Sequence, residues 1–262
     1  MTLAATISPR SAYAAKLRDF PDFVFAERDA FTHRECWAQL FGSRIGSSFD
    51  GRIIFEIGCF DADYLSRIAA KHPSTAFVGL DWKCKPLYDG ALRIVERGVR
   101  NVVLLRARGQ DVAKIFADGE LDEIWVFHPD PCDRPVELKN RLVAEPFLTD
   151  VHRVLRDHAS VLCLKTDHLG YYQSVQALFD EQSPSSEALH RRFDITANSA
   201  NYWHDATAQS ASAARCFAGE ATLFEQRFLK KRKPIHYFEL HKTQRGLPID
   251  PSGFACRNPP EP

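Results

Sequence analysis

Apolar and polar residues follow one another along this chain in blocks that predict strands and helices in regular alternation. Short runs of β-branched, aromatic and other apolar residues without a helical period predict buried strands. These runs lie at 52–58, 76–80, 102–105, 121–127, 160–165, 193–195 and 235–240. Between most of them, apolar residues recur at helical spacing. Helices are expected at about 61–71, 87–95, 111–116, 138–155 and 169–179, and from Thr222 onward. The alternation predicts a single α/β domain with an open sheet.

The segments outside this alternation have a different composition. Residues 1–50 carry scattered aromatic side chains without clear periodicity, which predicts an N-terminal arm with one or two short helices. Within the arm, the Gly/Ser-rich residues 42–50 predict a turn into the core. The polar stretch 196–219 predicts a long loop, and the proline-rich tail 248–262 is expected to be disordered. The predicted folded domain therefore runs from 51 to 247.

Length and composition limit the protein classes to which the chain can belong. With 262 residues, 45% of them hydrophobic and 26% charged, it is long enough to bury one large core. No apolar run approaches the roughly 18 residues that span a bilayer. The N-terminus also lacks the charged flank and apolar core of a secretion signal. We therefore expect a cytoplasmic protein without a membrane partner.

Cysteines and charges give weaker indications. The seven cysteines are odd in number and form no CxxC pair, which argues against a zinc site and a disulfide framework, so no metal is expected. The net charge is zero, yet basic residues are clustered. The clusters are 230–233, Arg134 with Lys139 and Arg141, and Arg191 with Arg192. Each alone is typical of a solvated face. Only clusters that converge on one face would form a phosphate-binding surface.

The most informative stretch is 127–134, Phe-His-Pro-Asp-Pro-Cys-Asp-Arg. The two prolines end the preceding strand, because proline lacks a backbone donor and restricts the residue before it. Asp130 is thus held at a strand's carboxyl end, where open α/β sheets bind ligands. An Asp-Pro turn without chemistry is the alternative. Asp167 follows the strand 160–165 and reaches the same edge if the two strands are neighbours. Lys165 is expected to order Asp167 or a phosphate.

Two further residues follow the first two strands of the predicted domain. Gly58 ends the strand 52–58, and Asp81 comes directly after the strand 76–80. Their separation is about that at which a Rossmann-like unit places an acidic residue against a ribose. The sequence therefore predicts a nucleotide-like ligand at this edge of the sheet.

The motifs EIGCFDAD, VGLD, HPDP, LKTD and TLFEQRF occur in this order between residues 52 and 242. As a set, they resemble the tRNA (guanine-N7)-methyltransferase family over roughly three quarters of the chain. The resemblance implies a seven-stranded Rossmann-like methyltransferase fold with S-adenosylmethionine as the methyl donor. It also implies a guanosine in the variable loop of tRNA as the acceptor. The sequence leaves open whether the protein is a monomer or a homodimer.

The resemblance assigns roles to individual residues. It implies that Glu56 and Gly58 contact the methionine part of the donor, and that Asp81 accepts hydrogen bonds from both ribose hydroxyls. Arg108 stands in the segment that faces the adenine. Asp130 matches the family's catalytic acid and also borders the donor. The residues implied to contact guanine or tRNA are Arg134, Asp167, Thr222, Leu223, Phe224 and Glu225.

These residue types suit the implied reaction. Guanine N7 carries an unprotonated lone pair at neutral pH, so its attack on a sulfonium methyl needs alignment rather than a base. The purine becomes positively charged as the bond forms. A carboxylate near its Watson–Crick edge, from Asp130 or Asp167, would therefore stabilise the transition state more than the ground state.

The chain departs from the family pattern at several positions. Phe60 and Ala62 stand where the turn after the first strand has its second and third glycines, and a side chain there crowds the donor or changes the loop. Arg108 replaces an acidic or amide residue, and Cys132 replaces tryptophan. These differences leave two alternatives to a tRNA methyltransferase. One is an enzyme of this fold with another RNA or a small molecule as acceptor. The other is a non-catalytic member that binds RNA or a partner.

Overall fold

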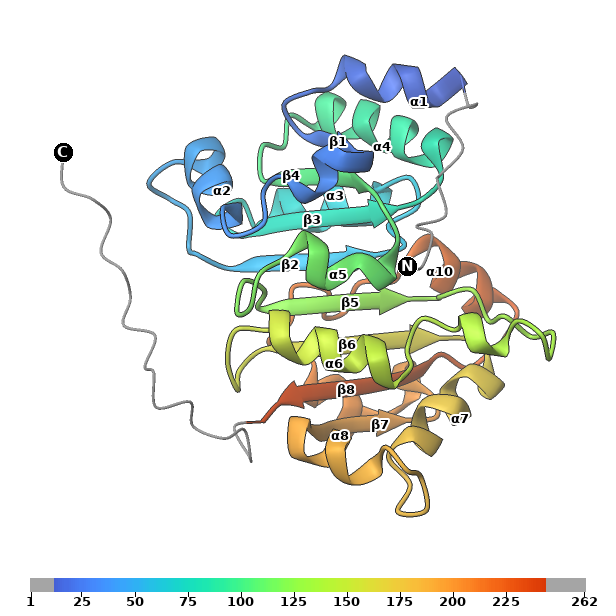
Figure 1. Ribbon diagram of the computed structural model, residues 1–262. Coiled ribbons are helices and arrows are strands. Elements are labelled where there is room, and N and C mark those ends of the chain that lie inside the picture. Colours follow the sequence, from blue (N-terminus) through green and yellow to red (C-terminus); the bar gives the residue numbers. More distant parts are fainter. Residues whose placement is uncertain (1–11, 244–262) are drawn as a thin grey trace, which may run out of the picture.

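The computed structural model describes residues 12–243, which form one mixed sheet between two layers of helices (Figure 1). The described residues contain eight strands in the order β1-β4-β3-β2-β5-β6-β8-β7. The strands are β1 (Val24–Ala26), β2 (Ile53–Ile57), β3 (Ala76–Asp81), β4 (Val102–Arg106), β5 (Glu123–Phe127), β6 (Val161–Thr166), β7 (Phe193–Ser199) and β8 (His236–Lys242).

Helices connect and cover these strands. The α-helices are α1 (Ala12–Lys16), α2 (Trp37–Ile45), α3 (Asp63–Lys71), α4 (Cys84–Arg97), α5 (Val112–Ile115), α6 (Glu145–Val154), α7 (Leu169–Leu178), α8 (Ser186–Arg192), α9 (Ala206–Ala211) and α10 (Leu223–Lys230). The short 3-10 helices are η1 (Leu17–Asp19), η2 (Glu27–Phe31), η3 (Gly109–Asp111), η4 (Leu138–Asn140) and η5 (Tyr202–His204).

Strand direction decides where the functional residues meet. Strands β1 to β6 are parallel, so their carboxyl ends lie along one edge of the sheet, on the right of Figure 1. Strand β8 runs antiparallel between β6 and β7. The residues that follow β2, β3, β5 and β6 therefore converge, although they are far apart in sequence.

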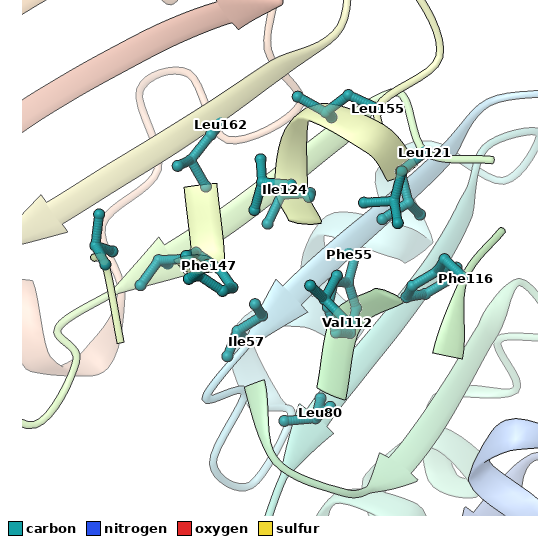
Figure 2. Close-up of a cluster of buried hydrophobic side chains, with 14 of the residues drawn as sticks. Phe55, Ile57, Leu80, Val112, Phe116, Leu121, Ile124, Phe147, Leu155 and Leu162 are labelled. Carbon is teal, nitrogen blue, oxygen red and sulfur yellow. The ribbon is translucent and has the colours of Figure 1, made fainter. Parts of the chain in front are cut away.

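Alternate residues of each strand face the two sides of the sheet and supply two apolar cores. On one side, Phe55 and Ile57 pack with Ile124 (Figure 2). Residues of α2, α5, α6, α7 and α8 complete this core. On the other side, Ile54 and Trp125 pack beneath α3, α4 and α9. Glu56 faces this second side, so a carboxylate takes an apolar position close to the carboxyl end of β2.

The strand count is the first departure from the prediction. Val24–Ala26, inside the predicted N-terminal arm, forms an eighth strand that pairs in parallel with β4. A three-residue strand is too short to show the two-residue alternation from which strands are predicted. It forms because the edge of β4 offers unpaired backbone groups.

The predicted helix 138–155 is wrong in its first half. The chain instead forms η4 and an irregular segment, and α6 begins at Glu145 with Pro146 in its first turn. Proline is accepted in the first turn of a helix but not in its interior. The apolar residues of this stretch do recur at helical spacing, but the helix begins only at Glu145, next to the proline.

Two predicted irregular segments contain regular structure. The predicted loop 196–219 begins inside β7, which continues to Ser199 because β8 pairs with it, and it also contains η5 and α9. In the predicted turn 42–50, α2 continues through Gly42 to Ile45. In the part of the chain from 12 to 243, no helix is both long and apolar enough to cross a membrane. The predicted tail 248–262, and residues 244–247 of the predicted domain, lie outside the described residues.

Candidate active site

Four predicted carboxylates lie at the carboxyl edge of the parallel strands. Glu56 is the second-last residue of β2, and Asp81 is the last residue of β3. Asp130 and Asp167 follow β5 and β6, which are neighbours in the sheet. The arrangement brings together residues from four separate parts of the sequence, as expected from the order of the strands.

A small cavity opens at this edge, between the β2–α3 turn (residues 58–62), the end of β5 and the start of α10. Its lining residues are Glu56, Gly58, Cys59, Phe60, Asp61, Asp63, Tyr64, Phe127, His128, Thr222, Leu223 and Phe224. The lining includes five predicted site residues, and it does not include Asp81, Arg108, Asp130, Arg134, Asp167 or Glu225. Its volume of about 30 Å³ is room for about one water molecule.

Glu56 is the most unusual group in this cavity. Its side chain is buried, and its Oε2 atom has no hydrogen-bond partner. Burial, together with the negative charges of Asp81, Asp61 and Glu225, raises the pKa of Glu56 to about 8. A buried carboxylate oxygen without a partner is costly, because it loses its hydration and no hydrogen bond replaces it. The site is therefore suited to a cationic ligand group.

Asp81 is tied to the β2–α3 turn by its own side chain. One of its carboxylate oxygens accepts a hydrogen bond from the Phe60 amide at 3.2 Å, and the other accepts one from the Lys83 amide at 2.8 Å. Burial raises the pKa of Asp81, and the two amides act against this effect. The next residue, Trp82, is 60% exposed and presents an indole ring at the same edge. Each carboxylate oxygen can accept a second hydrogen bond from a ligand.

The β2–α3 turn holds two residues other than glycine in left-handed backbone geometry. Phe60 has φ = 52° and Ala62 has φ = 48°. Glycine adopts this geometry freely, whereas for an L-residue it costs conformational energy. Residues with such strained backbone geometry are concentrated at functional sites. The Phe60 ring meets the Phe224 ring edge to face, with a centroid distance of 5.7 Å. The contact between these two rings bridges opposite walls of the cavity, and the rings occupy part of the space between them.

Asp130 lies in the loop that follows β5 and is exposed. Its Oδ1 atom accepts a hydrogen bond from the Cys132 amide at 3.2 Å, which fixes the carboxylate within the turn. Arg134, also exposed, forms an ion pair with Glu137. Both side chains are accessible to a large ligand.

Asp167 is less exposed and has two cationic or polar neighbours. Lys233 Nζ lies 3.2 Å from its Oδ2 atom, and His128 Nδ1 lies 3.6 Å from its Oδ1 atom. Partial burial raises the pKa of Asp167, but His128 and Lys233 outweigh this effect and hold the pKa below its ordinary value. Asp167 is therefore ionised at neutral pH.

Lys165 and Glu225 form a buried ion pair behind the cavity. Both side chains are fully buried, with Lys165 Nζ 3.1 Å from Glu225 Oε1. The same carboxylate accepts hydrogen bonds from Trp203 Nε1 at 3.2 Å and from the Thr222 amide at 2.8 Å. The expectation that Lys165 orders Asp167 is wrong, because its partner is on α10.

This arrangement changes the interpretation of the segment 222–225. Thr222 caps α10 and forms a reciprocal capping box with Glu225, as the Thr-x-x-Glu spacing predicts. Glu225 has no exposed surface, so we assign it to the support of α10 rather than to a substrate contact. Leu223 is 39% exposed and Phe224 lines the cavity, so these two side chains are the accessible part of the segment.

Two of the three basic clusters lie on the same edge as the carboxylates. Arg134, Lys139 and Arg141 follow β5, and 230–233 leads into the start of β8, which pairs with the end of β6. Arg191 and Arg192 precede β7, whose first residue pairs with the last residue of β8, so they lie at the opposite edge. Arg108 is exposed in the turn after β4, on the carboxylate edge.

Some lining residues were not predicted. Tyr64 carries no motif of its own, and His128 was not given a binding role. The backbone of His128 is left-handed, with φ = 53°, and its ring packs against Phe228 at a centroid distance of 5.3 Å. A His-Pro dipeptide at a strand end favours a packed or hydrogen-bonded ring, but it does not indicate which residues the ring contacts.

Comparison with protein-family models matches residues 50–237 to a family described as "Putative methyltransferase". The matched segment contains β2 to β7, the start of β8 and the whole cavity. The chain belongs to this methyltransferase family. Within residues 12–243, no group of histidine, cysteine or acidic side chains is arranged to hold a metal ion.

Curated relatives indicate which kind of methyltransferase this chain resembles. A tRNA (guanine-N(7)-)-methyltransferase of Christiangramia forsetii is 29% identical over 188 residues, which cover 72% of this chain and 77% of that protein. A bifunctional glycosyltransferase/methyltransferase of Fusobacterium nucleatum subsp. nucleatum is 27% identical over 88% of this chain, but the match covers 32% of that longer protein. The predicted membership of the tRNA (guanine-N7)-methyltransferase family is confirmed.

Solved structures support the fold. The structure of an antibiotic-related methyltransferase superimposes with a TM-score of 0.52 at 16% identity, over 77% of this chain and 92% of that chain. At an identity this low, the similarity supports the fold alone and not the function. The predicted Rossmann-like methyltransferase fold is confirmed, and the described part of the chain contains eight strands in place of the predicted seven.

Proposed function

We propose that this methyltransferase transfers the methyl group of S-adenosylmethionine to N7 of a guanine in the variable loop of tRNA. The observation that carries the proposal is Glu56, a buried carboxylate with an unpartnered oxygen in a cavity at the carboxyl edge. The motifs and the similarity to enzymes named for this reaction support the acceptor. A tRNA substrate also implies a cytoplasmic location.

Glu56 in the cavity, and Asp81 and Trp82 at the end of the next strand, fit the proposed donor chemically. When bound, S-adenosylmethionine supplies a methyl group on a positively charged sulfur, and it also carries an ammonium group. Glu56 would hold the ammonium group, and Asp81 would hold the ribose hydroxyls at the end of the next strand. The exposed Trp82 offers an apolar face for the adenine. These side chains would fix the donor beside the β2–α3 turn.

The acceptor side needs no general base. N7 is unprotonated at neutral pH, and the reaction gives a cationic purine, so preorganised negative charge is the useful contribution. Asp130 and Asp167 would accept hydrogen bonds from N1–H and the exocyclic amine of guanine. The basic clusters on the same edge would neutralise phosphates and position the RNA without reading its sequence. Asp167, held ionised by Lys233, is ready for this role.

The small cavity leads to a prediction for Phe60. Replacing Phe60 by glycine removes a side chain from the cavity and allows the left-handed backbone without strain. We expect Phe60→Gly to lower the dissociation constant of S-adenosylmethionine several-fold, as measured by isothermal titration calorimetry. The matched control is Val136→Gly, which removes an exposed apolar side chain outside the cavity. Weaker binding by Phe60→Gly would mean that the ring holds the donor instead of excluding it.

Glu56 should make donor binding depend on pH. In the free protein its pKa is about 8, so at pH 6 to 7 the side chain is mostly protonated. A cationic donor stabilises the ionised form, so binding must release this proton. We therefore expect donor affinity to rise as pH increases from about 6 to 8 and then to level off. The Glu56→Gln variant should bind more weakly at pH 8 and lose most of this dependence. An unchanged profile in that variant would assign the titration to Asp81, Asp61 or another group.

Methyl transfer from labelled S-adenosylmethionine to tRNA tests the proposal directly. The comparison substrate is the same tRNA with its variable-loop guanosine replaced by adenosine. Transfer to the first alone supports the proposal, and equal transfer to both indicates another acceptor. Donor binding without transfer to any tRNA would favour another RNA or a small molecule. Absence of donor binding would favour a non-catalytic member of the family, which the small cavity makes the second candidate.

A further inference from the structure

Helix α4 approaches the β2–α3 turn unusually closely, and it does so at a glycine. A Cβ atom built on Gly90 would lie 3.0 Å from the carbonyl oxygen of Asp61 and 3.1 Å from the Cβ atom of Ala62. Such contacts are tighter than ordinary van der Waals distances, so a larger residue would push the turn away. Gly90 is a residue of poor helix propensity in the middle of α4, and this close approach accounts for it.

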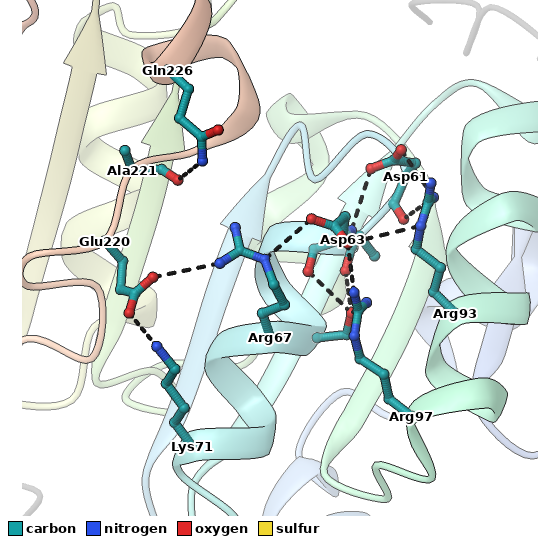
Figure 3. A network of polar contacts seen from close by, with 11 residues as sticks. Asp61, Asp63, Arg67, Lys71, Arg93, Arg97, Glu220, Ala221 and Gln226 are labelled. Atoms are coloured by element: carbon teal, nitrogen blue, oxygen red, sulfur yellow. Dashed lines mark hydrogen bonds and ion pairs between the residues drawn. The ribbon is translucent and has the colours of Figure 1, made fainter.

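One turn of helix further on, Arg93 binds the same backbone (Figure 3). Its Nη1 atom donates to the carbonyl oxygen of Asp61 at 3.2 Å and lies 2.9 Å from Asp61 Oδ2. Its Nε atom lies 3.9 Å from Asp63 Oδ1. The cavity lining includes Asp61 and Asp63 but neither Gly90 nor Arg93. Arg93 therefore contacts residues of the cavity wall without lining the cavity itself.

A series of ion pairs connects Asp63 with the opposite wall of the cavity. Asp63 also pairs with Arg97 at 2.6 Å and with Arg67 at 3.2 Å. Arg67 in turn lies 3.5 Å from Glu220, which also pairs with Lys71 (Figure 3). Glu220 precedes Thr222, the cap of α10, whose side chain lines the cavity. This network of alternating charges joins α4, the turn and the start of α10.

The turn has a physical need for such support. Left-handed geometry is disfavoured roughly tenfold for a residue other than glycine. Phe60 and Ala62 both adopt it, and the carbonyl group that Arg93 binds lies between them. If the turn relaxed, the Phe60 amide would leave Asp81 Oδ2, and the predicted ribose acceptor would lose its orientation.

We infer that Gly90 and Arg93 are positioning residues for the methyl donor. They hold the β2–α3 turn in the geometry that a glycine-rich turn adopts by itself. Gly90 allows the close approach, and Arg93 fixes the Asp61 carbonyl group and carboxylate. The inference rests on the proposed function for the identity of the donor, but it does not depend on the acceptor.

Donor binding by single variants gives the first test. We expect Arg93→Gln to raise the dissociation constants of S-adenosylmethionine and of its demethylated product about tenfold. The midpoint of thermal unfolding should shift by no more than a few degrees, and Arg93→Lys should recover part of the affinity. The matched control is Arg153→Gln, which removes an arginine of similar exposure that pairs with Asp118 far from the cavity. Wild-type affinity in Arg93→Gln would overturn the inference.

A pair of small substitutions separates positioning from general stability. Gly90→Ala improves helix propensity but places a Cβ atom against the Asp61 carbonyl oxygen, so a purely structural role predicts a change in thermal stability and unchanged donor affinity. We expect it instead to weaken donor binding about threefold to tenfold without a loss of thermal stability. This variant also keeps the inference testable if Arg93→Gln does not fold.

Ala62→Gly provides the decisive comparison, since it removes one left-handed residue that needs support. In an Ala62→Gly background, we expect Arg93→Gln to cost about threefold or less in donor affinity. An undiminished tenfold loss would mean that Arg93 acts on the donor by its charge, and would overturn the positioning role. A wild-type protein that binds neither S-adenosylmethionine nor its demethylated product would refute the proposed function instead.

Discussion

Replacing Asp130 by asparagine is expected to lower kcat/KM for tRNA methylation at least a hundredfold. The substitution keeps the size of the side chain and an oxygen for the Cys132 amide, but it removes the negative charge that would face the purine as it becomes cationic. Removing one preorganised group that stabilises transition-state charge commonly costs factors of this size. The measurement is transfer of a labelled methyl group to tRNA under single-turnover conditions.

Two controls test whether the expected loss of methyl transfer is specific to the acceptor side of the site. Donor affinity of Asp130→Asn should stay within about threefold of wild type, because the side chain lies outside the cavity lining. Asp118→Asn removes a comparable exposed carboxylate far from the site and should leave transfer unchanged. Equal losses of donor binding and transfer in Asp130→Asn would place this residue in the donor site. Unchanged transfer would leave Asp167 as the acid that contacts guanine.

The second large effect concerns stability. Replacing Lys165 by methionine leaves Glu225 buried without its cation, and breaking a buried ion pair in this way costs about 3 to 5 kcal/mol. For a chain of this size, the midpoint of thermal unfolding should fall by roughly 10 °C. Scanning calorimetry measures it. Donor affinity should fall as well, because Thr222 and Phe224 on the same helix end line the cavity.

The double variant Lys165→Met with Glu225→Gln distinguishes charge from packing. It contains no uncompensated buried charge, and the glutamine oxygen can still accept one of the two hydrogen bonds that Trp203 and Thr222 donate to separate oxygens of Glu225. We expect it to recover more than half of the lost stability. Lys85→Met, which breaks an exposed ion pair with Asp89, should leave the midpoint nearly unchanged. A double variant as unstable as Lys165→Met would show that the aliphatic part of the lysine, rather than its charge, is what matters.

The buried ion pair also connects the two halves of the site. Helix α10 begins at the cavity with Thr222, and the residues that follow it reach Asp167 through Lys233. Lys165 and Glu225 anchor this helix to β6 between the two points. Displacement of α10 would therefore change the donor wall and the surroundings of Asp167 together. The burial of Thr222 and Glu225 would thus support the proposed site as well as the fold.

The sequence by itself determined the fold class, the family and the edge of the sheet at which the predicted site residues gather. Strand runs such as 52–58 and 160–165 are continuous and apolar because parallel strands are buried on both faces. Asp81, Asp130 and Asp167 follow such runs, and parallel strands bring their carboxyl ends to one edge whatever the loops do. The cap at Thr222 was also predictable, since a capping box depends on residues three apart.

Tertiary structure alone decided which groups meet within the site. The eighth strand, β1, exists because β4 offers it an edge, and β7 continues to Ser199 because β8 pairs with it. The partner of Lys165 is Glu225, 60 residues later in the chain, and no local pattern indicates that distance. The left-handed turn at Phe60 and Ala62 is possible because Gly90 and Arg93 come from another helix to hold it. Local spacing predicts elements through short-range sterics and hydrogen bonds, whereas contacts between distant segments depend on how the whole core packs.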